Sequence, residues 1–166
     1  ISLGLVGSEM CIRDSDTGSY ATFSDMVDYL AWLGRQYTED PGRRTCLEAA
    51  ARAIHQHEQS LAEAMIRGTG NLRGLADIPG LHIIGGADST RREGVVSLWI
   101  ENRASEEIVS FLNARGIRTH TRKADHYSGN VLLPLGLKDC VRVSFSHYNS
   151  LAEVSQFLTA INEFQP

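Results

Sequence analysis

The chain has 166 residues, a formal net charge of −4 and a hydrophobic fraction of 42%, values typical of one folded globular domain or of a fragment of a larger protein. No apolar run approaches the roughly 20 residues that a membrane-spanning helix needs, and the mild acidity argues against nucleic acid or an anionic membrane as a partner. Only two of the 16 cationic residues are lysines, Lys123 and Lys138, which matters for any chemistry that requires a lysine.

The start of the chain differs in character from the rest. Residues 5–15, LVGSEMCIRDS, resemble the conceptual translation of a transposon adapter used in sequencing libraries. Arg13 follows the apolar part instead of preceding it, which argues against a secretory signal peptide. We therefore predict that residues 1–15 are an adapter artefact or a disordered tail, and that the gene was cut just before Asp16.

From Asp16 onward the hydrophobic pattern predicts both helices and strands. Apolar residues spaced three and four apart indicate helices, whereas short apolar runs bounded by glycine and charge indicate strands. In chain order we expect helices at 20–33 and 43–67, strands at 81–84 and 95–100, a helix at 105–115, strands at 117–122 and 140–146, and a helix at 150–164. This order predicts an α+β fold, a small sheet with helices packed on one face.

Residues at the helix ends support these assignments. Gly34 and Gly116 follow periodic apolar stretches and are typical of the position after a helix C-terminus. Ser105 is the expected N-cap of its helix. Ser150 and Glu153 have the spacing of a capping box, in which each side chain accepts a hydrogen bond from the other residue's backbone N–H.

Arg142 is the most informative single residue. In the strand at 140–146, alternation places Val141, Val143 and Phe145 on one face and Arg142 on the other. A guanidinium that projects from a regular strand is a rigid receptor able to bind both oxygens of a carboxylate. A solvated arginine on the outer face is the alternative that the pattern leaves open.

Two further segments carry groups suited to binding. Arg122 ends a predicted strand and precedes a polar, irregular stretch from Lys123 to Gly136, and loops of this kind often hold active sites. Gly18 and Ser19 precede the first predicted helix, where backbone amides and a hydroxyl can hold a phosphate. An ordinary connection and a simple N-cap are the respective alternatives.

The histidines and cysteines exclude several kinds of site. His55 and His57 are two residues apart on a predicted helix, so they cannot share a metal ion. The sequence has no Cys-x-x-Cys pair and no His-Glu-x-x-His motif, and we predict no metal site. Cys140 is expected to be a small buried residue, and the lack of a disulfide pattern predicts a cytoplasmic protein.

Several of these segments together resemble the C-terminal part of the class V aminotransferases, in particular the cysteine desulfurase and selenocysteine lyase-like group. The strongest match is VRVSFSHYN at 141–149 with Ser150 and Glu153 after it, which is similar to the family signature Arg-x-Ser-x-x-x-Tyr-Asn-Thr-x-x-Glu. In the segment 116–136, Arg122 occupies the arginine position of an Arg-x-Gly-His-His-Cys loop. Residues 16–19 resemble a Glu-x-Gly-Thr segment.

The resemblance implies a pyridoxal 5'-phosphate enzyme of fold type I that acts on an amino acid as a homodimer. It implies that Arg142 binds the substrate α-carboxylate and that Arg122 also contacts the substrate. Gly18 and Ser19 would contact the cofactor phosphate of the partner subunit. Residues 16–38 would then be the remainder of the large cofactor-binding domain, and residues 39–166 the C-terminal small domain.

The chain also departs from the desulfurase pattern. Tyr127 stands where the loop has its nucleophilic cysteine, and Ala124 and Asp125 replace the first glycine and the first histidine. A lyase, aminotransferase or racemase-like reaction therefore fits better than one that forms a persulfide. His126 and Tyr127 are candidates for proton transfer.

The lysine that holds the cofactor as a Schiff base lies upstream of these segments in the family. Neither Lys123 nor Lys138 has a matching context, so we expect the covalent centre to be absent from this chain and the fragment alone to be inactive. The alternative is a non-enzymatic α+β module for ligand binding or regulation, in which Arg142 and Arg122 form an anion site without a cofactor.

Overall fold

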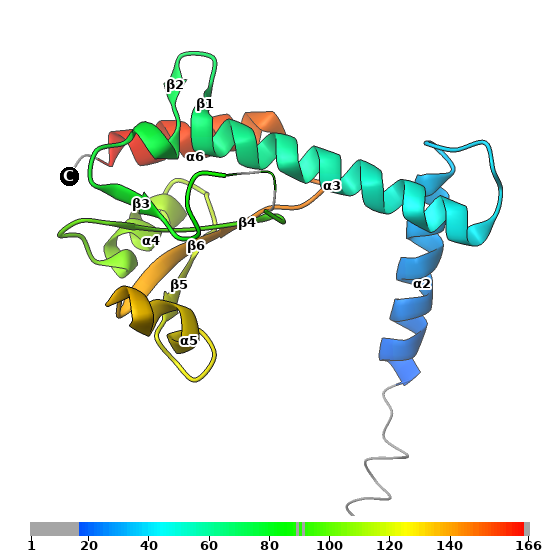
Figure 1. Ribbon diagram of the computed structural model, residues 1–166, viewed down its shortest axis with the longest axis horizontal. Helices are drawn as coiled ribbons and strands as arrows, with labels where there is room; N and C mark the ends of the chain where they lie inside the picture. Colours follow the sequence, from blue (N-terminus) through cyan, green and yellow to red (C-terminus); the bar gives the residue numbers. More distant parts are fainter. Residues whose placement is uncertain (1–16, 89, 91, 165–166) are drawn as a thin grey trace, which may run out of the picture. The chain divides into compact units, whose positions relative to one another are not determined.

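The computed structural model describes residues 17–88, 90 and 92–164 (Figure 1). The predicted artefact or tail at 1–15 lies outside the described residues, as does Asp16. By its contacts the chain divides into two compact units, residues 1–53 and 54–166, which we describe separately. The domain boundary predicted at 38/39 stays a prediction.

The first unit consists of helix α2 (Thr17–Gly34) and the beginning of helix α3 (Arg43–Arg67). The two helices are joined by a turn, in which the Asp40 carboxylate accepts hydrogen bonds from the Gly42 N–H at 2.8 Å and the Thr45 hydroxyl at 2.9 Å. Cys46 is fully buried. Gly34 packs so closely on it that a Cβ atom would lie 1.8 Å from the Cys46 carbonyl oxygen.

The second unit is built on a four-stranded antiparallel sheet. Its strands are β3 (Leu81–Ile83), β4 (Val95–Ile100), β5 (His120–Lys123) and β6 (Asp139–Ser144), in the spatial order β3-β4-β6-β5. A small hairpin of β1 (Gly68–Thr69) and β2 (Leu72–Arg73) follows α3, and a 3₁₀ turn, η1 (Leu75–Asp77), leads to β3. Of the two central strands, β4 is apolar except for Ser97, and β6 carries Arg142 between two valines.

Helices cover one face of this sheet, which confirms the predicted fold class. Helix α4 (Ser105–Asn113), helix α6 (Leu151–Glu163) and the end of α3 contribute apolar side chains to a single core with β3, β4 and β6. In Figure 1, α6 and the end of α3 lie along one side of the sheet, and the short helix α5 (Gly129–Leu132) lies on the other side. Val141, Val143 and Phe145 face the core as predicted.

The predicted helix ends are partly confirmed. Ser150 is the N-cap of α6, and both hydrogen bonds of its capping box with Glu153 are present. Gly116 has a left-handed φ of +77° and follows α4 as predicted. Ser105 is not the N-cap of α4. The N–H groups of Glu107 and Ile108 both donate to the Ala104 carbonyl, so Ala104 is the N-cap and Ser105 is the first residue of the helix.

Two predicted elements begin three residues away from their expected starts. The strand expected at 117–122 starts only at His120, because the Ile117 N–H donates to the Leu112 carbonyl and the Thr119 N–H donates to the Asn113 side chain, both at 3.0 Å. The first helix begins at Thr17 instead of residue 20. Gly18 and Ser19 therefore lie within its first turn and do not precede it.

Candidate functional site

The sheet face opposite the core carries both predicted arginines. Arg142 lies in the middle of β6, in register with Ser97 of β4 and with His120 of β5. Arg122 of β5 lies directly across from Cys140 of β6. Because side chains alternate along a strand, Arg122, Arg142, Cys140 and Ser97 all project from this one face.

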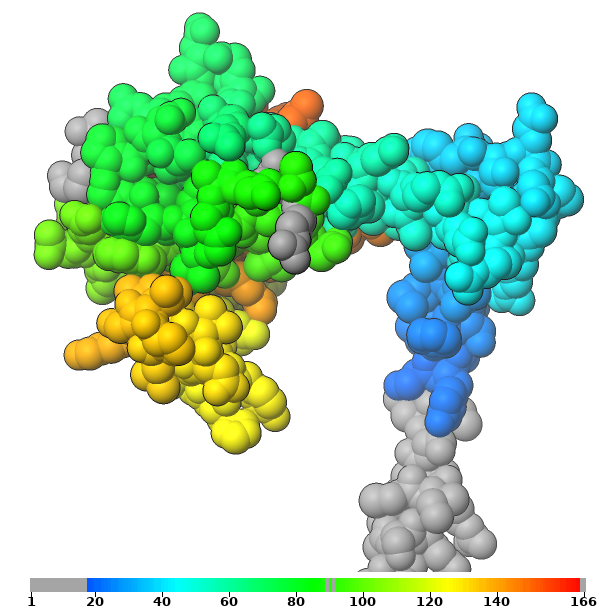
Figure 2. All heavy atoms as spheres, viewed as in Figure 1, coloured from blue at the N-terminus to red at the C-terminus, as the bar shows by residue number. Residues whose placement is uncertain are grey.

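These side chains line a pocket of about 230 Å³ between the sheet and the α5 segment. Its lining residues are Ile84, Ser97, Arg122, Ser128, Val131, Leu132, Cys140 and Arg142. In Figure 2 the segment from 124 to 137, in yellow to gold, stands out from the body of the second unit. The structure thus places the two predicted substrate-binding arginines in the same concavity.

Arg142 has an unfilled hydrogen-bonding requirement in this pocket. Its side chain is half-buried, and its Nε atom is fully buried with no hydrogen-bond partner in the described part of the chain. Leaving a buried donor without a partner costs about 1–3 kcal/mol, and more for a charged group. Its partial burial and its place in the pocket distinguish Arg142 from the solvated outer-face arginine considered as its alternative.

Cys140 is a structural residue of the pocket floor. Only 4% of its surface is exposed, which confirms the prediction of a small buried residue. Burial raises the pKa of the Cys140 thiol, and a hydrogen bond with the Ser97 side chain acts in the opposite direction. Because the thiolate is the reactive form of cysteine, this environment disfavours Cys140 as a nucleophile.

His126 and Tyr127 lie on the loop that follows β5. The Asp125 carboxylate accepts hydrogen bonds from the Tyr127 N–H at 3.0 Å and from the Ser128 N–H at 2.8 Å, and these bonds shape the loop. They also lower the pKa of Asp125, with the Ser128 N–H making the largest contribution. Tyr127 is 82% exposed, and neither His126 nor Tyr127 lines the pocket. Their role in proton transfer stays a prediction.

The remaining predicted groups are not part of the pocket. Gly18 and Ser19 belong to α2 in the first unit, where the N–H groups of a first helical turn point toward the helix N-terminus. Lys123 forms an ion pair with Glu106 at 2.9 Å, and the Glu106 carboxylate raises the pKa of Lys123. Lys138 is exposed. Among the described residues, no cluster of His, Cys, Asp and Glu is placed to hold a metal ion.

Several pocket residues were not identified from the sequence. Ser97 interrupts the apolar strand predicted at 95–100. This signal indicates from which face of the sheet Ser97 projects, but it does not identify the residue beside it on the neighbouring strand. Its pairing with Arg142 depends on the register of two strands about 45 residues apart, which no local pattern specifies. Val131 and Leu132 belong to α5, a four-residue helix too short to show a periodic pattern.

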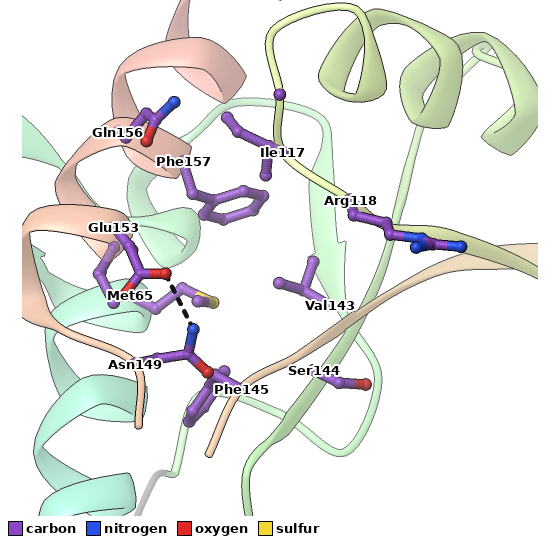
Figure 3. Close-up of a pocket in the computed structure, with 12 residues that line it drawn as sticks. Met65, Ile117, Arg118, Val143, Ser144, Phe145, Asn149, Glu153, Gln156 and Phe157 are labelled. Atoms are coloured by element: carbon purple, nitrogen blue, oxygen red, sulfur yellow. Dashed lines mark hydrogen bonds between the residues drawn. The ribbon is translucent and has the colours of Figure 1, made fainter. Parts of the chain in front are cut away.

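A second cavity lies on the helix-covered side of the sheet. It measures about 270 Å³, and Ile117, Val143 and Phe157 are among the apolar residues that line it (Figure 3). Glu153 at its rim already accepts hydrogen bonds from the Asn149 side chain at 3.0 Å and the Ser150 N–H at 2.7 Å. Because this carboxylate is satisfied and neither predicted arginine is present, we assign the candidate site to the other face.

Known proteins match both the sequence and the fold. Over 109 residues the chain is 36% identical to a probable cysteine desulfurase 1 of Mycobacterium leprae, a match covering 65% of the chain and 16% of that relative. Over 113 residues it is 30% identical to a probable cysteine desulfurase of Pseudomonas putida, covering 68% of the chain and 25% of that relative. The chain thus spans a quarter or less of the length of these two relatives.

Solved structures agree with these matches. The apo structure of a cysteine desulfurase from Thermococcus onnurineus superposes with a TM-score of 0.58 at 25% identity, over 76% of the chain and 32% of that structure. The cysteine desulfurase CsdA of Escherichia coli has the same fold, with a TM-score of 0.52 at 20% identity, over 76% of the chain and 31% of that structure.

The sequence profile of the family described as aminotransferase class V matches residues 44–157. This range contains the whole sheet, both arginines of the pocket and most of α6. The resemblance stated from the sequence is therefore confirmed, and the protein belongs to the class V aminotransferase family.

Proposed function

We propose that the chain is part of a pyridoxal 5'-phosphate-dependent enzyme that acts on an amino acid, and that Arg142 binds the substrate α-carboxylate. Class V aminotransferases are enzymes of this cofactor class, and the curated relatives are named as cysteine desulfurases. The observation that carries the assignment is the half-buried Arg142 in a pocket shared with Arg122. A carboxylate bound in this pocket would accept charge-assisted hydrogen bonds from a guanidinium group.

The strand position of Arg142 makes it suitable for orienting a substrate. Its backbone is held on both sides, by β4 and by β5, so the direction in which the side chain leaves the sheet is fixed. A rigid guanidinium that holds both carboxylate oxygens also fixes the orientation of the substrate Cα atom. The role of Arg142 in this proposal is to bind and orient, not to transfer a proton.

Neither lysine of this chain fits the role of binding the cofactor covalently. Lys123 is paired with Glu106, and neither Lys123 nor Lys138 lines the pocket. We propose that the Schiff-base lysine is supplied by another part of the parent enzyme. Gly18 and Ser19 would contact the cofactor phosphate across the interface of a homodimer, a role consistent with their place in the first turn of α2.

The exposed apolar surface supports the view that this chain is one part of a larger protein. Tyr20, Phe23 and Trp32 of α2 are each more than half exposed. In the second unit, Leu133 and Leu135 of the 3₁₀ helix η2 (Leu133–Leu135) are also more than half exposed. Large apolar side chains gathered on a surface are typical of interfaces. We propose that the parent enzyme covers them, and that the isolated chain is catalytically inactive.

Two observations favour a lyase or aminotransferase reaction over a desulfuration that forms a persulfide on this chain. Tyr127 occupies the loop position of the nucleophilic cysteine in the family pattern. Cys140 is buried, and its raised pKa keeps it protonated.

The described cysteines, Cys46 and Cys140, are both free and buried, which supports a cytoplasmic location. No described helix is long and apolar enough to cross a membrane.

The experiment that tests this proposal begins with the genomic sequence upstream of Asp16. We expect an open reading frame that supplies the cofactor lysine, and a completed protein that develops a visible absorbance band when mixed with pyridoxal 5'-phosphate. A natural start codon a few residues before Asp16, or a completed protein without that band, would contradict the proposal. Either result would favour a non-enzymatic module that uses the two arginines as an anion site.

A further inference from the structure

The cavity on the helix-covered side of the sheet has no part in the proposed function. It measures about 270 Å³, and its lining comes from α3, α6, β6 and the segment 116–118, all of the second unit. One unit therefore forms this cavity without the rest of the parent enzyme. Pockets for small molecules typically measure roughly 300–1,000 Å³, so a cavity of this size suits a ligand at the small end of that class.

Most of the cavity wall is apolar. Met65 of α3, Val143 of β6 and Phe157 of α6 line it together with Ile117. In Figure 3 these side chains surround one space, and the Met65 thioether and the Phe157 ring both face it. Thioether and aromatic groups pack favourably against an aromatic ring. The wall therefore favours a ligand with an apolar, aromatic body.

A carboxylate borders this apolar wall. The Glu153 side chain points toward the cavity in Figure 3, and hydrogen bonds from the Ser150 N–H and the Asn149 side chain hold it there. These bonds lower the pKa of Glu153, with the Ser150 N–H contributing most, so the group is ionised at neutral pH. Among the described residues Glu153 forms no ion pair, so its charge has no cationic partner.

Glu153 also has room for a further hydrogen bond. An ionised carboxylate can accept about four. Its Oε2 atom accepts from the N–H of Ser150 at 2.7 Å and from the Ser150 hydroxyl at 3.0 Å, whereas Oε1 accepts one bond, from the Asn149 side chain. Oε1 can therefore accept another bond from a ligand in the cavity.

The adjoining edge of β6 supplies a second acceptor. Ser144 lines the cavity, and because β5 begins only at His120, no strand of the described chain pairs with Ser144 on this side. The Ala124 N–H donates to the Lys138 carbonyl, and alternate residues of a strand point their backbone groups the same way, so those of Ser144 point toward the β5 side. The Ser144 carbonyl is thus available to a ligand.

The cation of the lining lies outside the enclosed space. Arg118 is exposed, and in Figure 3 its side chain extends away from the cavity and from Glu153. Arg118 also does not line the pocket of Arg122 and Arg142. The charge that faces the cavity is therefore negative, and it is complementary to a cationic ligand.

We propose that this cavity binds a small primary amine with an aromatic body, whose ammonium group pairs with the Glu153 carboxylate while its ring lies against Met65 and Phe157. An ammonium group has three N–H donors and no acceptor, which matches a rim that offers a carboxylate and a carbonyl. The inference is independent of the proposed function, because it uses neither Arg142 nor Arg122.

The test compares 2-phenylethylamine with 2-phenylethanol, which has the same ring and linker but no charge. Binding to the 166-residue chain is measured by NMR titration at neutral pH and low ionic strength, in the wild type, Glu153→Gln and Glu163→Gln. Glutamine also serves as the third residue of a capping box, so Glu153→Gln removes the charge and keeps the cap of α6. Glu163→Gln is the matched control, because Glu163 lies on the same helix and pairs with Arg115 outside the cavity.

We expect the amine to bind about threefold to fivefold more tightly than the alcohol, the upper part of the range for an exposed ion pair. The largest chemical-shift changes should fall on the amides of Ile117, Ser144 and Gln156, which line the cavity. The preference should vanish in Glu153→Gln, persist in Glu163→Gln, and shrink in the wild type as salt is added.

Equal binding of the two probes, no binding of either, or a preference that survives in Glu153→Gln would overturn the inference. A preference lost equally in Glu163→Gln would show attraction to the chain's overall charge and would also overturn it. Tighter binding of Nα-acetyl-lysine amide than of 2-phenylethylamine would assign the cavity to a lysine side chain of another polypeptide segment instead. If circular dichroism shows that Glu153→Gln is unfolded, a wild-type preference unchanged by salt contradicts the inference.

Discussion

Replacing Gly94 with alanine should push apart the two central strands of the sheet. A Cβ atom at this position would lie 2.0 Å from the Phe145 carbonyl oxygen and 3.1 Å from its carbon. These are backbone atoms, so no side-chain rotation can relieve the contact. The Phe145 N–H also donates to the Gly94 carbonyl at 2.8 Å, and this bond would lengthen as the strands separate.

The size of the effect follows from the competing terms. Overpacking of a tightly built region costs about 1–3 kcal/mol, and weakening a backbone hydrogen bond adds about 0.5–1.5 kcal/mol. Alanine lowers the conformational entropy of the unfolded chain, which stabilises the folded state by about 0.4–1 kcal/mol. We therefore expect a net destabilisation of about 1–3 kcal/mol, together with weaker anion binding, since β4 carries Ser97 opposite Arg142.

Urea denaturation followed by circular dichroism measures this change as a lower midpoint at constant slope. Gly129→Ala is the matched control, because a Cβ atom there meets the Leu133 side chain at 3.4 Å and no closer atom. Gly129 lies in helix α5, where alanine is favoured over glycine, so that variant should be neutral or slightly stabilising. A Gly94→Ala variant within 0.5 kcal/mol of the wild type would refute the reasoning, since about that much is the scatter expected of neutral substitutions.

Three further predictions concern α6 and the pocket floor. Ser150→Ala removes the N-cap of α6 and should cost about 1 kcal/mol of unfolding free energy, measurable by urea denaturation against the conservative variant Ser150→Asp. In the folded state the pKa of Glu153 is lowered, most by the hydrogen bond from the Ser150 N–H and next by the one from the Asn149 side chain. The stability that Glu153 contributes is therefore present at neutral pH and is lost as the pH falls through this lowered pKa. In Glu153→Gln the free energy of unfolding should fall less steeply at acidic pH, and an unchanged fall would argue against this role. Alkylation of Cys140 by iodoacetamide should be much slower in the folded chain than in urea, as mass spectrometry of the modified peptide would show; equal rates would contradict its burial and raised pKa.

The fold could be predicted from the sequence wherever a residue's local pattern determines its environment. The alternation of β6 identified which side chains enter the core, and the spacing of Ser150 and Glu153 identified the start of α6. The start of β5 could not be predicted in this way. There the Asn113 side chain accepts a hydrogen bond from the Thr119 N–H. This contact keeps Thr119 out of the strand, and the apolar pattern of the segment gives no sign of it.

The candidate site could be predicted only in part, for a related reason. The sequence and the family resemblance identified Arg142 and Arg122, because each stands in a recognisable motif. They did not show that the two arginines share a pocket, which depends on the register between β5 and β6. The unpaired Nε of Arg142 is likewise a property of the packed structure, since burial and hydrogen-bond partners come from segments distant in the sequence.

The most direct test of the account is the kinetic effect of Arg142→Gln in the completed parent enzyme, with Arg118→Gln as the control. Because Arg142 is proposed to hold the substrate α-carboxylate through charge-assisted hydrogen bonds of about 1.5–3 kcal/mol, kcat/KM for the amino-acid substrate should fall by about tenfold to a hundredfold, largely through KM. Arg118→Gln should leave it unchanged. A kcat/KM within twofold of the wild type in Arg142→Gln would contradict the assignment of this pocket as the substrate site.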